Sequence, residues 1–190
     1  MATTPERLIE SMRSLLWERG YVGTSPKAVL RRADVGQGSM YHHFSGKRDL
    51  GVAAIRRTAD EMRVGTEELF ATHGGALERV RAYLLRERDV LRGCPVGRLT
   101  QDPEVMADDA LRAPVDETFA WLRARIAEVL AEGREGGELR AAMDPEETAA
   151  AVVATLQGGY VLARAARSRA PFDQAVAGIL GLLKAHGAQD

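Results

Sequence analysis

Ten residues from Val35 to Phe44, with the sequence Val-Gly-Gln-Gly-Ser-Met-Tyr-His-His-Phe, constrain the fold of this chain more than any other stretch. Two glycines and a serine favour a tight bend and then a helix start, because glycine tolerates conformations that other residues avoid and serine caps helix N-termini. The apolar Met40 and Phe44 follow at helical spacing, on either side of three polar rings. The pattern predicts a turn and then a short helix that buries Met40 and Phe44 and presents its polar rings on the other side.

Two more helices are predicted before this stretch, at residues 4–20 and 25–35. The first has Thr4 as its expected N-cap and apolar residues at helical spacing, and the second opens on Ser25 followed by proline. Together with the helix at 37–44 they form a three-helix unit whose last two helices are joined by a turn.

The rest of the chain repeats apolar residues at helical spacing, with no strand alternation and no internal repeat. Glycines, prolines and capping residues divide it into six further helices, expected near residues 47–69, 77–91, 104–111, 114–129, 145–163 and 171–183. The segment 93–103 is too rich in glycine and proline for an ordinary helix. The sequence therefore predicts an all-α fold of about nine helices, with an N-terminal helix-turn-helix domain at 1–50 and a C-terminal helical domain at 51–190.

Charge is divided unevenly along the chain. The first 50 residues carry eight Lys/Arg against five Asp/Glu, whereas the remainder carries 18 against 22, and the net charge is -1. A basic N-terminal part suits an acidic partner such as nucleic acid, but a pI near 6.5 is not that of a general nucleic-acid coat. Any contact with DNA must therefore be local and multiplied by dimerisation.

Cys94 is the only cysteine and cannot form a disulfide within the chain. We find no signal-peptide pattern and no apolar run of membrane-spanning length, because Arg7 and Glu10 interrupt the N-terminus and Arg164 follows the most apolar later stretch. We therefore expect a protein of the reducing cytoplasm that does not associate with a membrane.

The helices expected at 145–163 and 171–183 carry closely spaced small residues. Gly158 and Gly159 lie on the first, and glycines 178 and 181 lie on the second. Small residues permit close backbone approach, which suits a helix-to-helix interface.

Five short segments of the N-terminal part stand in a fixed order. They are Gly20-Tyr21, Ser25, Ala33-Asp34-Val35, Gly38-Ser39-Met40-Tyr41-His42-His43-Phe44 and Lys47-Arg48-Asp49-Leu50. Together they resemble the tetracycline-repressor (TetR) family of bacterial transcription regulators, and the rest of the chain agrees with that family in the count and order of its helices. The segment Gly93-Cys94-Pro95-Val96-Gly97 is similar to the subgroup that includes the LmrA and YxaF repressors.

The resemblance implies an all-helical homodimer. Helices one to three bind a double-stranded DNA operator, the remainder binds a small-molecule effector, and the last two helices pair with their copies across a two-fold axis. One departure is Gly36, where many relatives have serine or threonine at the start of the recognition helix. The missing hydroxyl puts more weight on Gln37 and Ser39.

Eight residues form the predicted DNA-binding site. In a helix-turn-helix protein the second helix of the motif lies in the major groove with its first residues at the base edges. Gln37 can bridge the N6/N7 edge of adenine, Ser39 can reach either type of base, and Gly38 permits close approach of the backbone. The residues better placed for phosphates are Ser25, Lys27, Tyr41, His42 and Lys47.

Nine residues are predicted to line an effector cavity, because the irregular segment and three helices must enclose something. The apolar lining consists of Leu99, Met106, Phe119, Trp121, Val152, Leu156 and Tyr160, with Thr155 or Gln157 as a polar anchor. For each residue taken alone, a place in the ordinary core is the alternative. A small apolar or aromatic effector would fit this lining.

The sequence therefore predicts a ligand-responsive transcription regulator, a repressor with activation left open, that binds a palindromic operator. It predicts no catalytic residue, no cofactor and no metal site, since His42 and His43 are consecutive and point about 100° apart on a helix. Two alternatives stay open: a dimeric small-molecule-binding protein without specific DNA recognition, and an enzyme that uses Cys94 with a distant histidine.

Overall fold

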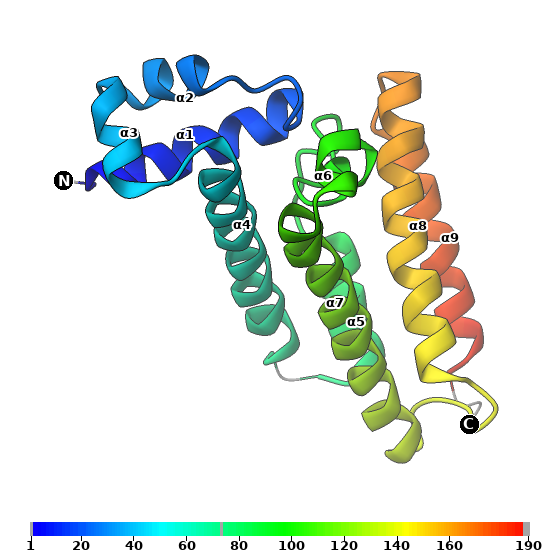
Figure 1. Ribbon diagram of the computed structural model, residues 1–190. Coiled ribbons are helices and arrows are strands. Elements are labelled where there is room, and N and C mark those ends of the chain that lie inside the picture. The colour runs from blue at the N-terminus through cyan, green and yellow to red at the C-terminus, as the bar shows by residue number, and fades with distance from the viewer. Residues whose placement is uncertain (1, 73, 188–190) are drawn as a thin grey trace. The chain divides into compact units, whose positions relative to one another are not determined.

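Helices make up most of the part of the chain that the structure describes. The computed structural model describes residues 2–72 and 74–187, and at Gln37 only the backbone (Figure 1). Its elements are α1 (Thr4–Arg19), α2 (Pro26–Ala33), α3 (Gln37–His43), α4 (Lys47–Phe70), α5 (Ala76–Leu85), the 3-10 helix η1 (Gly97–Gln101), α6 (Pro103–Ala107), α7 (Asp109–Glu135), α8 (Pro145–Ala166) and α9 (Ala170–Ala185). Within these residues there is no strand, and the one β-bridge joins Leu139 to Gly187. The predicted all-α fold is confirmed.

The chain forms two compact units. Unit 1 contains the residues up to Met62 together with Pro95–Thr118, and unit 2 contains Arg63–Cys94 together with the residues from Phe119 onward. Helices α4 and α7 are each divided between the two units: their first residues belong to unit 1 and their last residues to unit 2. The domain boundary predicted after residue 50 lies inside α4, and it stays a prediction.

In unit 1, α1 packs against α2 and α3 around an aliphatic core (Figure 1). Leu8, Met12, Val29 and Met40 are almost entirely buried there. The predicted start of α2 is confirmed, because the Ser25 hydroxyl accepts the amide of the third helical residue at 3.2 Å.

The start of α1 differs by one residue from the prediction. Its N-cap is Thr3 rather than Thr4. The Glu6 carboxylate accepts hydrogen bonds from the Thr3 amide at 2.6 Å and from the Thr3 hydroxyl at 2.9 Å. The hydrogen bond from the amide is the main cause that lowers the pKa of Glu6. Threonine with glutamate three residues later is a capping box, which determines the first turn here.

The carboxylate of Asp102 joins the end of α1 to the start of α6 within unit 1. One oxygen accepts the amides of Tyr21 at 2.6 Å and Val22 at 2.9 Å, and the other accepts two amides of the first turn of α6 at 3.1 and 3.3 Å. Asp102 is only 7% exposed, and a buried carboxylate is stable only where hydrogen bonds replace its hydration. Gly20 fits beside it at φ 77°, since a Cβ there would lie 2.7 Å from the Asp102 carboxylate.

Two charged contacts hold the same stretch within unit 1. Arg98 donates to the carbonyl of Trp17 in the last turn of α1. Arg48 donates to both oxygens of Asp108, at 2.5 and 2.9 Å, and this bond lowers the pKa of the Asp108 carboxyl. Segments distant in sequence are thereby joined by charge-assisted hydrogen bonds.

Helix α7 begins earlier than predicted. We expected its start at Pro114, but it starts at Asp109 and the proline lies inside it. The Asp108 carboxylate accepts two amides of the first turn at 2.9 and 3.3 Å, so an N-cap comes before the proline. The cap determines the helix start, and the helix accommodates the proline a little beyond its first turn.

Helix α5 ends earlier than predicted. We expected a helix up to Leu91, but α5 ends at Leu85 and Leu91 is 50% exposed. The Arg88 guanidinium donates to the carbonyls of Tyr83, Leu84 and Arg86. It thus satisfies carbonyls that would otherwise accept the amides of a continuing helix.

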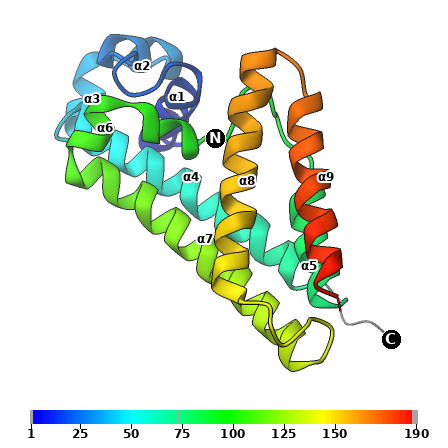
Figure 2. The same ribbon diagram turned by 90° about the vertical axis from the view of Figure 1, so that its right-hand side faces the viewer.

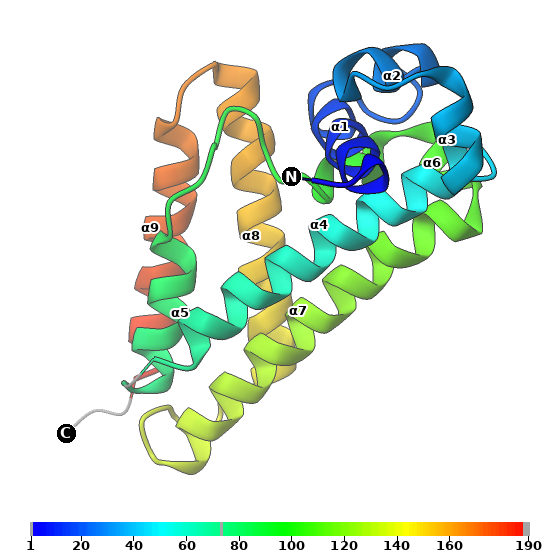
Figure 3. The same cartoon turned by 90° about the vertical axis from the view of Figure 1, so that its left-hand side faces the viewer.

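In unit 2, α8 and α9 run side by side (Figures 2 and 3). Gly159 permits their close approach, because a Cβ there would lie 3.0 Å from the Phe172 ring. A Cβ at Gly158, Gly178 or Gly181 would meet nothing within 4 Å. These three glycines therefore face outward from the single chain.

The predicted start of α8 is confirmed, because the Asp144 carboxylate accepts the Glu147 amide at 2.8 Å.

Contrary to the sequence analysis, one helix of the described chain, α8, is long and apolar enough to cross a membrane, with a mean hydropathy of 1.2 over 18 residues. Its Val152, Leu156 and Ala163 belong to the core of unit 2. Length and composition alone are weak support for a membrane span, since a core helix has the same properties.

Replacing Asp102 with alanine should lower the free energy of unfolding by about 2–3 kcal/mol, because buried amides then lose a charged acceptor. Urea denaturation at a fixed protein concentration measures the change. The exposed Asp60 of α4 provides a control, since Asp60→Ala should change stability by less than about 0.5 kcal/mol. Equal midpoints for the two variants would contradict the role of Asp102.

Candidate functional site

The turn between α2 and α3 is closed by backbone hydrogen bonds and one arginine. Asp34 follows α2 in the left-handed conformation at φ 52°, and the Val35 amide bonds back to the carbonyl of Leu30 at 3.2 Å. Arg7 of α1 donates to the Asp34 carbonyl at 2.8 Å and reaches its carboxylate at 3.3 Å. Helix α3 therefore starts from a turn that α1 holds in place.

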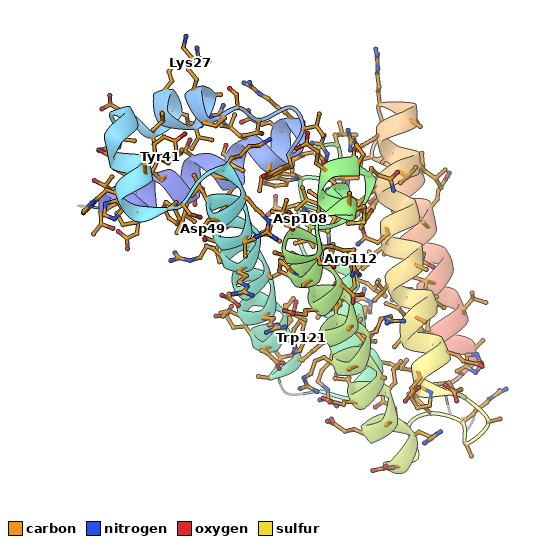
Figure 4. All side chains as sticks on the ribbon, viewed as in Figure 1. Lys27, Tyr41, Asp49, Asp108, Arg112 and Trp121 are labelled. Atoms are coloured by element: carbon orange, nitrogen blue, oxygen red, sulfur yellow. The ribbon has the colours of Figure 1, made fainter. Side chains whose placement is uncertain are left out.

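Helix α3 has one buried side and one exposed side. Met40 is 0% exposed, as predicted, whereas Phe44 at the C-cap is only partly buried. On the other side Tyr41 is 56% exposed and His42 is exposed, and Figure 4 labels Tyr41 on this helix. The polar rings are thus exposed on one side of α3, and the buried Met40 anchors its other side.

The predicted base-reading residues lie in the first turn of α3. Gly38 is exposed and Ser39 is partly exposed, and a Cβ at Gly38 would meet nothing within 4 Å. The side chain of Gln37 lies outside the described part of the structure, so its role stays a prediction. An open first turn permits the close backbone approach that base-edge contacts require.

Of the predicted phosphate contacts on α2, Lys27 is the most available. It projects outward (Figure 4), and no acidic side chain of the described chain pairs with it. Ser25 is exposed but uses its oxygen as the N-cap of α2. Arg31 lies one turn after Lys27, is also exposed, and has no acidic partner in the described residues. Sequence reasoning missed Arg31, although the spacing of four residues from Lys27 was a usable signal.

Lys47 is held by its own unit more than we predicted. Its ammonium lies 3.8 Å from the centroid of the Tyr21 ring and 3.6 Å from the Glu104 carboxylate. Burial is the main cause that raises the pKa of Tyr21, so its ring is a neutral platform for this cation. The proposed contact of Lys47 with phosphate stays a prediction.

Most other basic residues of the helix-turn-helix are paired. Arg13 contacts Glu61, Arg32 contacts Glu18 at 2.7 Å, and Arg48 contacts Asp108. In the described part of unit 1, the exposed Lys27 and Arg31 of α2 are therefore cations that remain available to an acidic partner. Within the same residues no three His, Cys, Asp or Glu side chains are grouped as metal ligands are.

The predicted effector residues are divided between the units. Leu99 and Met106 belong to unit 1, and the other seven belong to unit 2. In unit 2, Val152 and Leu156 are core residues, and the partly exposed positions are Phe119, Trp121, Thr155, Gln157 and Tyr160. A groove of about 680 Å³ between α7 and the start of α8 is lined by none of the nine. The predicted cavity stays a prediction.

Three residues of unit 2 that sequence reasoning missed interact with one that it predicted. Tyr83, Arg86 and Arg88 interact electrostatically with Tyr160, and the Tyr160 ring lies 4.9 Å from that of Phe172. The sequence predicts a continuous helix over 77–91, so the early end of α5 was needed to recognise this cluster.

A short helix with an exposed polar side, held behind a tight turn by a buried methionine, is the arrangement expected of a DNA-binding protein of the helix-turn-helix class. Comparisons with known proteins agree. Residues 8–54 match the family described as bacterial regulatory proteins, tetR family, and residues 74–179 match the tetracyclin repressor-like C-terminal domain. The chain belongs to the TetR family of transcriptional regulators.

Several regulators are similar along nearly the whole chain. It is 27% identical over 188 residues to the HTH-type transcriptional repressor NemR of Escherichia coli strain K12, covering 95% of this chain and 94% of NemR. The crystal structure of reduced E. coli NemR superposes with a TM-score of 0.85 over 98% of both chains. The transcriptional regulator AcuR of Cereibacter sphaeroides is 30% identical over 166 residues, covering 84% of this chain and 75% of AcuR.

The predicted subgroup has weaker support. LmrA of Bacillus subtilis is 23% identical over 186 residues, covering 94% of this chain and 96% of LmrA. The likeness to the LmrA and YxaF subgroup therefore stays a prediction. The family and these relatives are regulators rather than enzymes.

Replacing Lys27 with alanine should weaken binding to all DNA sequences alike, because a phosphate contact carries no sequence information. A plot of log affinity against log salt concentration should lose about 1 unit of slope for each phosphate contact removed. Fluorescence anisotropy at several salt concentrations measures both effects. Arg81→Ala, which removes an exposed charge from α5, is the matched control and should leave the slope unchanged. A loss confined to one DNA sequence would instead make Lys27 a base-reading residue.

Proposed function

We propose that the protein is a repressor that binds a palindromic operator as a homodimer and releases it when a small apolar or aromatic effector binds. The observation that carries the proposal is the exposed polar side of α3 on its buried Met40 anchor. The relatives NemR and DhaR are named as transcriptional repressors, which favours repression over activation. Regulators of this family act on bacterial DNA, which implies a cytoplasmic protein.

In this proposal the readers of the base edges are Gln37, Gly38 and Ser39. Phosphates are contacted by Tyr41 and His42 of α3, by Ser25 at the N-cap of α2, by Lys27 of α2 and by Lys47 of α4. We add Arg31 to the phosphate contacts because it is exposed beside Lys27. One copy offers few base contacts, so specificity depends on a second copy on the other half-site, about 34 Å or a multiple of that distance away.

The proposed dimer interface is the outward side of α8 and α9. Leu162 is 54% exposed, Val161 and Leu182 are also exposed, and the open glycines of both helices lie among exposed positions. Exposed apolar residues on adjoining helices are typical of a surface that another chain covers. Small residues in between permit two helix pairs to approach closely.

The proposed switch follows from linkage between the two binding events. An effector that binds better to a dimer whose two α3 helices are wrongly spaced must weaken operator binding by the same factor. Helix α4 begins directly after the DNA-binding helices in unit 1 and contributes residues 63–70 to unit 2, so we propose that it transmits the change.

The enzyme alternative has little support, because Cys94 is buried and a nucleophile must reach its substrate. The alternative without specific DNA recognition is tested directly by the operator experiment below.

Replacing Gln37 with alanine should weaken operator binding by about 1–3 kcal/mol, because one bidentate base contact is lost. The measurement is fluorescence anisotropy at two salt concentrations, with a DNA fragment from upstream of the protein's own gene and a scrambled fragment. Binding to the scrambled fragment should not change. If the wild-type protein binds both fragments equally, specific repression is wrong.

Replacing Leu162 with aspartate should produce monomers, because a buried charge without a partner would face its own copy across the interface. Sedimentation velocity measures the mass. The control is Leu91→Asp, which introduces the same charge at an equally exposed leucine outside α8 and α9. If the Leu91 variant dissociates and the Leu162 variant does not, the interface is placed wrongly.

A further inference from the structure

Two arginines just after α5 have no acidic partner. No Asp or Glu side chain of the described residues pairs with Arg86 or Arg88. The two guanidinium groups instead repel each other, because both are positively charged. Both side chains are partly buried. Two neighbouring positive charges with reduced hydration are unfavourable unless something negative compensates them.

The two arginines differ in what they already contact. Arg88 is engaged with the carbonyls at the end of α5, which account for both of its terminal nitrogens. Arg86 makes one side-chain hydrogen bond, from Nη1 to Thr66 Oγ1 at 3.3 Å, and its guanidinium carbon lies 4.8 Å from the Tyr83 ring centroid. A guanidinium has five donors in a planar fork. Arg86 therefore keeps most of its donors available, and Arg88 contributes a fixed positive field.

Two phenols complete the same cluster with neutral hydroxyls. Burial is the main cause that raises the pKa of Tyr160 to about 12, and burial likewise raises the pKa of Tyr83. Both hydroxyls thus keep their protons near neutral pH and can donate hydrogen bonds. The Tyr160 ring also packs against Phe172, so donors and aromatic surface occur together.

A third arginine lies one helical turn before Thr66. Arg63 Nε is buried and has no hydrogen-bond partner in the described structure, and its guanidinium carbon lies 5.4 Å from the centroid of the ring of Trp121, a residue that Figure 4 labels. Buried arginine nitrogens are normally paired. The unsatisfied donor extends the positive, donor-rich character of the cluster along α4.

We propose that unit 2 contains an anion-binding site centred on Arg86, with Tyr160 as a second donor and Arg88 as a positioning residue, and that it takes the carboxylate or sulfonate of an aromatic or apolar ligand. A guanidinium fork matches such a group in a bidentate arrangement. The ring of Tyr160, which is partly exposed, receives the apolar part. The inference rests on the proposed function only in identifying this ligand with the effector.

A pair of fluorescent probes tests the charge requirement. The first, 8-anilinonaphthalene-1-sulfonate, carries an anion, and the second, N-phenyl-1-naphthylamine, has the same rings without it. The full-length protein should bind the sulfonate more tightly. In Arg86→Gln the dissociation constant for the sulfonate should rise at least about tenfold, as expected for a lost charged hydrogen bond, while that for the amine stays within about twofold.

Two further variants keep the test decisive. Arg81→Gln removes a charge from the exposed side of α5 and should alter neither constant. Arg86→Lys retains the charge and should retain a preference for the sulfonate even if Arg86→Gln folds poorly. Equal affinity for both probes, an equal loss in the Arg81 and Arg86 variants, or no binding of either probe overturns the anion site.

Operator binding, measured separately, distinguishes this inference from the proposed function. An Arg86-dependent preference for the sulfonate without any change in operator affinity supports the anion site and contradicts the switch. Specific operator binding without that preference leaves the repressor in place and overturns the anion site.

Discussion

The buried carboxylate of Asp102 is the interaction on which unit 1 depends. It replaces its lost hydration with four backbone amides, two after α1 and two in the first turn of α6. These amides are themselves orphans, since a turn and a helix start leave them without backbone acceptors. One side chain thus satisfies the backbone amides of two segments that lie about 80 residues apart in sequence. The helix-turn-helix and the segment from η1 to α7 therefore belong to one compact unit.

Local signals of helix starts were predictable because they act within one turn. Serine before proline at α2 and aspartate before proline at α8 form the expected caps, and the buried Met40 follows from helical spacing alone. Glycine at position 159 also permits the helix contact that its size suggested. The caps depend on short-range chemistry, and the other two features depend on residue spacing and residue size, so the printed sequence contains them.

The errors occurred where a distant or unexpected side chain decided the outcome. Pro114 suggests a helix start, but the Asp108 cap comes first and is itself held by Arg48 from α4. The apolar spacing continues to Leu91, but Arg88 folds back and ends α5. Arg86 and Arg88 consequently leave the helical pattern and interact electrostatically with Tyr160 on α8. The anion site that we propose, which combines α8 with the segment after α5, could not be recognised from periodicity.

The DNA-binding side was more accessible to prediction than the effector side, because α3 is continuous in sequence and an effector site is not. The central claim about DNA binding is that two copies of α3 bind two symmetric half-sites. Hydroxyl-radical footprinting on DNA from upstream of the protein's own gene tests it most directly. Two symmetric protected patches are expected, with centres one helical turn apart, about 10 base pairs, or a multiple of it. A single protected patch, or uniform protection of the whole fragment, would contradict it.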